Sequence, residues 1–155
     1  MTEQQKDFLQ NNLVPLLQTL SPGQKGNWGK MDAQQMVEHL ADIFRVANGA
    51  IVLPLMNKDP EKLAQARTFL MSDAFFQQNT RVPVMPEEPR PYGCASIQEA
   101  IQNMAYECDQ VFTVYQSDPA LTLMHPMFGP LDYTMQIHYL HKHIHHHLRQ
   151  FGLVN

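Results

Sequence analysis

Apolar residues recur at helical spacing in four long stretches of the chain. The expected helices cover residues from about 2 to 20, 32 to 49, 96 to 117 and 131 to 151. Pro15 lies inside the first stretch, where a proline should kink the helix or restrict its start. No stretch shows the convincing period-two alternation of a half-buried strand. The pattern therefore predicts an all-α fold in which four amphipathic helices form a bundle.

Capping signals mark two of these helix starts. Asp32 is followed by Gln35, and Ser96 is followed by Glu99. In each pair the first side chain can accept a hydrogen bond from the helix backbone while the second reaches back, as in a capping box. We therefore expect helices to begin just after Asp32 and just after Ser96.

The middle of the chain, from about residue 50 to 95, is harder to interpret. Asp59 and Pro60 resemble an N-cap followed by a first-turn proline, so an extra helix is expected from there to about Phe76. Its inward positions would be Leu63, Ala66, Leu70 and Ala74. The next stretch, residues 79–95, reads as a long Pro-rich connection across the end of the bundle, with a disordered linker as the alternative; its prolines are Pro83, Pro86, Pro89 and Pro91.

Length and composition indicate one domain covering residues 1–155, because 155 residues with 44% hydrophobic content can bury a sizeable core. The net charge of -4 argues against nucleic acid or an anionic membrane as the main partner. No secretory signal or run of about 20 apolar residues is visible, which favours a cytoplasmic protein. Cys94 and Cys108 are expected to be reduced and inert.

The last predicted helix carries most of the candidate chemistry, because six of the eight histidines lie in it: His138, His141, His143, His145, His146 and His147. Two pairs at i,i+4 spacing flank its apolar arc, and the helical wheel alone does not choose between them. The His141 and His145 pair merges with His138 and Arg149 into a cationic arc, which is expected to be solvated. The His143 and His147 pair lies beside three neutral side chains that can hydrogen-bond a ligand's second nitrogen: Gln136, Tyr139 and Gln150. This environment favours His143 and His147 as the inward pair.

Two imidazoles one helical turn apart can grip a single metal ion, provided that a third ligand comes from elsewhere. His39 is the candidate, because it interrupts the apolar face of the second helix between Met36 and Ile43. The simpler alternatives are a buried, hydrogen-bonded His39 and a last helix whose histidines form a polar surface. Trp28 either closes the core or lines a site, and His125 either reaches the site or is solvated.

Three blocks of sequence resemble the DinB/YfiT-like superfamily, in particular a branch known chiefly as a domain of unknown function. They are Trp28-Gly29-Lys30-Met31 with Met36 and His39, His125-Pro126-x-Phe128-Gly129, and the stretch from His143 to Gly152. Members of that superfamily are four-helix bundles that hold a divalent metal with one histidine of the second helix and a His-x3-His pair of the last. The resemblance implies a metal on His39, His143 and His147. The remaining pocket candidates are His146, His125, Gln150, Trp28 and Phe128.

The resemblance also implies a class of function, since characterised relatives are thiol-cofactor-dependent transferases and isomerases, and others are assigned as metal-dependent hydrolases. We therefore expect one divalent ion, zinc or nickel ahead of iron or manganese, a low-molecular-weight thiol cofactor, a small-molecule substrate and a homodimer. Glu38 and Asp42 flank His39 but face away on the wheel, which weakens hydrolysis because no inward carboxylate can act as base. The alternatives are a metal- or ligand-binding bundle without turnover and a dimerisation module with a vestigial site.

Overall fold

The computed structural model describes residues 2–78 and 88–155 and is mostly helical, which confirms the all-α class. Within that part of the chain, none of the helices combines the length and apolar character needed to span a bilayer. The elements are α1 (Thr2–Asp7), η1 (Phe8–Asn12), α2 (Leu13–Leu17), α3 (Ala33–Ala47), α4 (Pro60–Leu70), α5 (Ile97–Ser117), β1 (Leu123–His125), β2 (Gly129–Leu131) and α6 (Tyr133–Gln150).

The first three elements form one continuous helical segment that accommodates Pro15 without breaking. Proline has no backbone N–H, and its ring would clash with the carbonyl of Asn11 in a regular α-helix. Ahead of Pro15 the chain widens into the π-helix η1, and the Leu13 N–H donates to the carbonyl of Phe8. The predicted helix of residues 2–20 is therefore present, but it ends at Leu17 and contains a π-turn ahead of Pro15.

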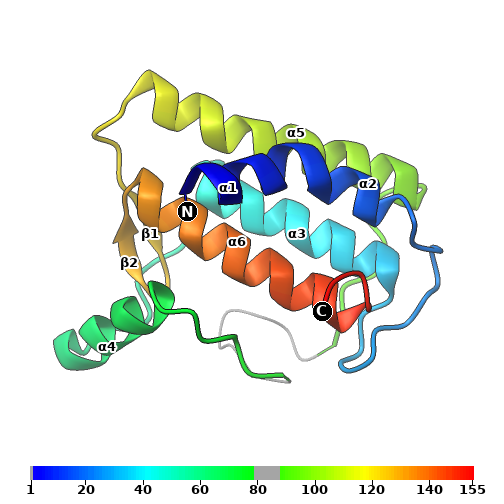
Figure 1. Cartoon of the computed structure of the whole chain (residues 1–155), viewed down its shortest axis with the longest axis horizontal. Coiled ribbons are helices and arrows are strands. Elements are labelled where there is room, and N and C mark those ends of the chain that lie inside the picture. Colours follow the sequence, from blue (N-terminus) through cyan, green and yellow to red (C-terminus); the bar gives the residue numbers. More distant parts are fainter. Residues whose placement is uncertain (1, 79–87) are drawn as a thin grey trace.

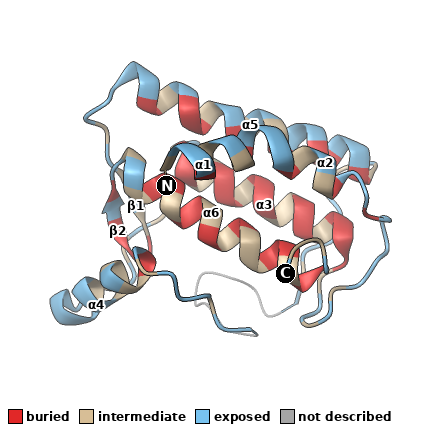
Figure 2. Cartoon of the chain, viewed as in Figure 1, coloured by how far each residue is buried: buried red, intermediate tan, exposed pale blue. Residues whose placement is uncertain are grey.

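Four helical segments lie side by side, namely α1 to α2, α3, α5 and α6, while α4 projects from one end (Figure 1). Helix α3 packs on both α5 and α6, α1 packs on α6, and α2 packs on α5. The buried residues face the interior of this assembly (Figure 2), and one hydrophobic core cluster joins all four segments. The expected arrangement of four amphipathic helices is thus present in the described residues.

The capping signals place the helix starts as predicted. Asp32 accepts from the Gln35 N–H while the Gln35 side chain accepts from the Asp32 N–H, so the capping box of α3 is complete. Ser96 caps α5 by accepting from the Glu99 N–H. The Glu99 carboxylate bonds to the N–H of Ala95, one residue before the cap, so this box is only half formed.

Helix α4 starts as expected but ends early. Asp59 caps it, and it ends at Leu70 where the sequence had predicted Phe76. After that point the Ser72 hydroxyl donates to the Phe69 carbonyl and accepts from the Ala74 N–H, a local arrangement that competes with the helix. Of the positions expected to face inward, Leu70 is buried, Leu63 and Ala66 are half-buried, and Ala74 is exposed. Pro83 and Pro86 lie outside the described residues, and Pro89 and Pro91 lie in a stretch without helix or strand.

The predicted loop before the last helix contains an antiparallel hairpin that the sequence did not reveal. Leu123 lies opposite Leu131 and His125 lies opposite Gly129. Strands of three residues are too short to show period-two alternation. The hairpin delivers the chain to Asp132, which caps α6 by accepting from the Met135 N–H.

Candidate metal centre

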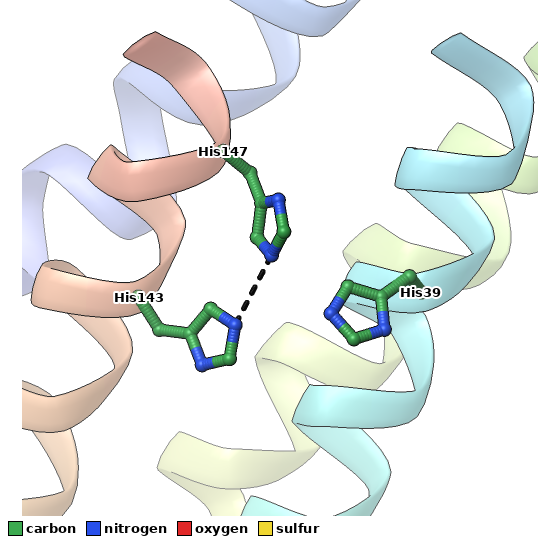
Figure 3. A group of neighbouring side chains, drawn as sticks. All are labelled: His39, His143 and His147. Atoms are coloured by element: carbon green, nitrogen blue, oxygen red, sulfur yellow. Dashed lines mark hydrogen bonds between the residues drawn. The ribbon is translucent and has the colours of Figure 1, made fainter. Parts of the chain in front are cut away.

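Three imidazole rings converge between α3 and α6. His39 comes from α3, and His143 and His147 come from successive turns of α6 (Figure 3). One ring nitrogen from each residue lies within 4.8 Å of the others. The Nε2 atoms of His143 and His147 are 3.1 Å apart. The structure thus brings together the three residues that the sequence analysis had selected, and this group can hold a metal ion.

The apolar faces of the two helices aim these rings at one another. On α6, the side chains of Ile137, Leu140, Ile144 and Leu148 are fully buried. His143 and His147 lie next to that stripe and therefore point towards the neighbouring helix at the edge of the core. His147 is buried, while His143 and His39 are half-buried. The position of the site thus follows from the packing of α6 on α3.

Gln150 fixes the orientation of the His147 ring. Its Nε2 donates to the carbonyl of Trp28 at 2.8 Å, so its Oε1 must face the other way. That Oε1 lies 2.8 Å from Nδ1 of His147, which therefore carries the proton. Because the proton is on Nδ1, the Nε2 lone pair of His147 points into the site.

Tyr139 makes the corresponding contact with His143, because its hydroxyl lies 2.9 Å from Nδ1 of that residue. Tyr139 is buried, and burial raises the pKa of its hydroxyl, which stays protonated. Without a metal, the 3.1 Å contact between the two Nε2 atoms needs one proton, and His147 cannot supply it. His143 then donates from Nε2, and Tyr139 donates to Nδ1 of His143.

The sequence analysis had named three neutral neighbours of the inward pair, and two of them perform that role. Tyr139 and Gln150 contact the second nitrogens of His143 and His147. Gln136 does not, because its amide donates to the Ala47 carbonyl and to the Tyr115 hydroxyl in the core. Gln136 lies about one helical turn before Tyr139 on α6, and it does not reach the imidazoles.

The three imidazoles are neutral at physiological pH. Burial is the main cause that lowers the pKa of His39, to about 4, and it lowers the pKa of His143 and His147 well below the usual range. The rings also disfavour charge on one another, because a second cation so close would repel the first. Neutral imidazole, and not imidazolium, is the form that a metal ion binds.

The donor set and its spacing suit a divalent transition metal. Two nitrogens bound at ~2.1 Å to one tetrahedral or octahedral ion lie about 3.0–3.4 Å apart. The 3.1 Å between the Nε2 atoms of His143 and His147 falls in this range. Imidazole donors suit zinc, nickel, copper and iron, and three of them leave coordination positions open.

His146 and Trp28 lie beside the three-histidine group. The rings of His146 and Trp28 meet edge to face with centroids 5.7 Å apart. The His146 ring is 5.2 Å from that of His147 but does not join the group of converging nitrogens. Trp28 contributes its carbonyl to Gln150 and its indole to the contact with His146.

His125 supports the site from the hairpin and does not enter it. Its Nδ1 accepts from the N–H groups of Met127 and Phe128, which holds the turn. Its ring lies 4.4 Å from that of Tyr139. Phe128 is buried and packs on the same tyrosine. Both residues therefore act on the site through Tyr139.

The second histidine pair of α6 is only partly exposed, because Phe8 packs on it, so the prediction of a solvated arc is wrong in part. The rings of His141 and His145 are 4.2 Å apart, and each packs against Phe8 of η1. His138 is half-buried too, and its Nδ1 lies 3.2 Å from Nε2 of Gln5. A helical wheel shows which residues share a face but not which segment covers it, and here α1 and η1 cover it.

The two carboxylates near His39 are engaged elsewhere, as expected. Glu38 accepts from the N–H groups of Gly93 and Cys94. Asp42 pairs with Arg45. Both cysteines are free, and burial raises the pKa of Cys108 to about 12, which makes its thiol unreactive.

Two residues beside the site were not expected from the sequence: Phe76, and Lys142, whose ammonium donates to the Ser72 carbonyl. The Phe76 ring packs edge to face on His143 at 5.5 Å. Phe76 was expected to end a helix, and nothing in its local sequence indicates the contact.

Comparisons with protein-family models, curated proteins and solved structures give no match to this chain. The function is therefore inferred from the geometry of the site.

Proposed function

We propose that the protein is a metal-dependent enzyme that acts on a small molecule at His39, His143 and His147. The observation that carries this proposal is the convergence of three neutral imidazoles within 4.8 Å. Titratable side chains whose pKa values are strongly lowered and which converge in one place are typical of functional sites. The resemblance to the DinB/YfiT-like superfamily supports the same residues, and the four helical segments agree with its bundle.

The protein would orient the ligands and exclude water. Gln150 and Tyr139 hold the second nitrogens of His147 and His143. Phe76 and Phe128 bring apolar surface against the rings of His143 and Tyr139, which strengthens electrostatic interactions at the site. When bound, a divalent ion with open coordination positions supplies Lewis acidity that lowers the pKa of a water or thiol and activates it as a nucleophile.

A thiol-dependent transferase fits these residues better than a hydrolase. Hydrolysis needs a base close to the water, and Glu38 and Asp42 are engaged elsewhere. A thiol cofactor brings its own nucleophile, whose low pKa relative to water reduces the need for a base. His146, with its ring 5.2 Å from that of His147, is the candidate proton acceptor if the reaction is hydrolysis.

The wider proposal is a cytoplasmic homodimer with a zinc or nickel ion, or iron or manganese, and a low-molecular-weight thiol. Two other functions compete with it. A metal-binding bundle would retain the ion without turnover, and a dimerisation module with a vestigial site would not retain the ion at all. These three possibilities give different results with the same protein.

The discriminating experiment loads the metal-free protein separately with zinc, nickel, iron and manganese. Each form is assayed with a low-molecular-weight thiol plus small electrophiles, and with small esters. We expect metal-dependent turnover of the thiol together with the electrophile. This turnover should be lost in His39→Ala and kept in His141→Ala. A bound ion with no turnover of either substrate class would favour the non-catalytic bundle, and faster turnover of esters would favour the hydrolase.

A further inference from the structure

The segment that follows α4 is bound to α6 next to the metal centre. We call residues 72–76 the strap. The Lys142 ammonium donates to the carbonyl of Ser72 at 2.7 Å and to the carbonyl of Ala74. Lys142 precedes His143 directly in the chain. The strap is therefore attached to the residue adjacent to one of the three converging histidines.

Lys142 is an unusual anchor because its side chain is buried, with 8% of the residue exposed. Burial disfavours the ammonium and lowers the pKa of Lys142. The two strap carbonyls and the ring of Phe69, 5.0 Å from the ammonium, offset that cost. If the strap moved away, the buried ammonium of Lys142 would lose both of these acceptors, which is unfavourable. Lys142 therefore favours the observed position of the strap.

Phe76 lies at the other end of the strap and is fastened separately. Its ring packs edge to face against His143 at 5.5 Å and against His146 at 6.1 Å. The rings of Phe69 and Phe128 support it from behind, at 5.6 Å and 6.5 Å. Phe76 therefore forms a wall directly beside the metal centre.

The preceding residue shows that this placement is specific. Phe75 is 65% exposed, and its ring packs under the guanidinium of Arg149, 3.9 Å from the ring centre. Phe75 and Phe76 thus have the same side chain on the same strap, but only Phe76 contacts His143. The pair provides a matched comparison for the function of the wall.

We propose that the strap, held by Lys142 and His146, closes one side of the His39/His143/His147 centre and that Phe76 limits the size of the ligand admitted there. This inference depends on the proposed function for its ligand, because a metal site must bind its substrate at the open positions. Phe76 is then the residue that determines which ligand sizes fit, and Lys142 is the residue that positions the strap.

The first test uses the metal-free protein and needs no metal. Diethyl pyrocarbonate modifies accessible imidazoles, and mass spectrometry locates the modified residue. In Phe76→Ala we expect His143 to react about tenfold faster than in wild type. In Phe75→Ala the rate of His143 modification should stay within about twofold of the wild-type rate. Lys142→Met should give an intermediate increase with Phe76 intact, and Phe76→Leu provides a milder variant if Phe76→Ala fails to fold. Equal His143 rates in Phe76→Ala and Phe75→Ala would overturn the proposal.

The second test uses the cobalt-loaded protein, whose visible spectrum reports ligands at the metal. Azide is the small probe and thiophenol is the large one. Phe76→Ala should raise the affinity for thiophenol about tenfold relative to azide, and Phe75→Ala should leave the ratio unchanged. An unchanged ratio in Phe76→Ala would overturn the role in specificity while the metal site stands. A wild-type protein that takes up no cobalt would overturn the proposed function, and faster His143 modification would then still support the strap.

Discussion

The Gln150 side chain oxygen lies 2.8 Å from Nδ1 of His147, and this contact determines which nitrogen of His147 faces the metal centre. The amide cannot rotate, because its nitrogen donates to the Trp28 carbonyl. The loop before α3 and the end of α6 are joined a second time by the Asn27 N–H, which donates to the Gln150 carbonyl at 2.6 Å. The orientation of a site imidazole thus depends on a backbone carbonyl in a distant loop.

Replacing Gln150 with leucine should weaken metal binding. Leucine has a similar size but cannot accept the His147 proton, so the ring loses its preferred tautomer and orientation. We expect the metal affinity to fall about 10- to 100-fold, as measured by competition with a chromogenic chelator. Gln102→Leu, on an exposed position of α5, is the matched control and should leave the affinity unchanged. Equal affinities in the two variants would show that Gln150 does not orient His147.

Replacing Gly29 with alanine should disturb the same contact from the other side. Gly29 has a positive φ of 76°, and a Cβ placed there would lie 2.7 Å from Nε2 of Gln150. We expect the free energy of unfolding to fall by about 1–2 kcal/mol and the metal affinity to fall as well. Gly23→Ala is the control, because a Cβ there meets nothing within 4 Å. Thermal melts and chelator competition on both variants measure the two effects.

Metal binding should change the tautomer of His143 and leave that of His147 unchanged. In the metal-free protein, His143 carries its proton on Nε2 and donates to Nε2 of His147. A metal on that nitrogen forces the proton to Nδ1, where the Tyr139 oxygen accepts it. Two-bond ¹H–¹⁵N correlation spectra distinguish the two tautomers before and after zinc is added. A His143 ring with its proton on Nδ1 in both states would contradict this proton arrangement.

Helix positions and the three converging histidines could be predicted because both depend on local sequence. Asp32 and Ser96 carry cap signals that act within one helical turn, and these set the starts of α3 and α5. The i,i+4 spacing of His143 and His147 places them on one face of α6 in any packing. His39 was identifiable because a histidine interrupts an otherwise apolar face.

The remaining features depend on contacts between distant segments. His141 and His145 were expected in solvent because the wheel does not show that Phe8 packs over them. The position of Phe76 could not be predicted because Lys142, which lies far along the chain, binds the carbonyls that follow α4. Single-sequence patterns contain no information about such pairings.

The metal-free protein should lose stability as the pH falls from about 6.5 to about 4. Burial lowers the pKa of His125 and of His141 to about 4, so the unfolded chain takes up their protons first. The unfolded state then binds more protons, and the free energy of unfolding decreases by about 3 kcal/mol for one such group. In His125→Asn the side-chain oxygen can still accept from the hairpin N–H groups but does not titrate. Urea melts at pH 7 and pH 4.5 should show a smaller loss in this variant, and an equal loss would contradict the assignment to His125.

Elemental analysis of the purified protein shows whether His39, His143 and His147 form one metal site. The protein is purified without a nickel column, and its metal content is compared in three forms: wild type, His143→Ala with His147→Ala, and His141→Ala with His145→Ala. The two double variants remove the same spacing from the same helix, but only the first removes residues of the three-histidine group. We predict about one divalent ion per chain in wild type and in the His141/His145 variant, and almost none in the His143/His147 variant. A wild-type chain without bound metal, or equal metal content in both double variants, would contradict the claim.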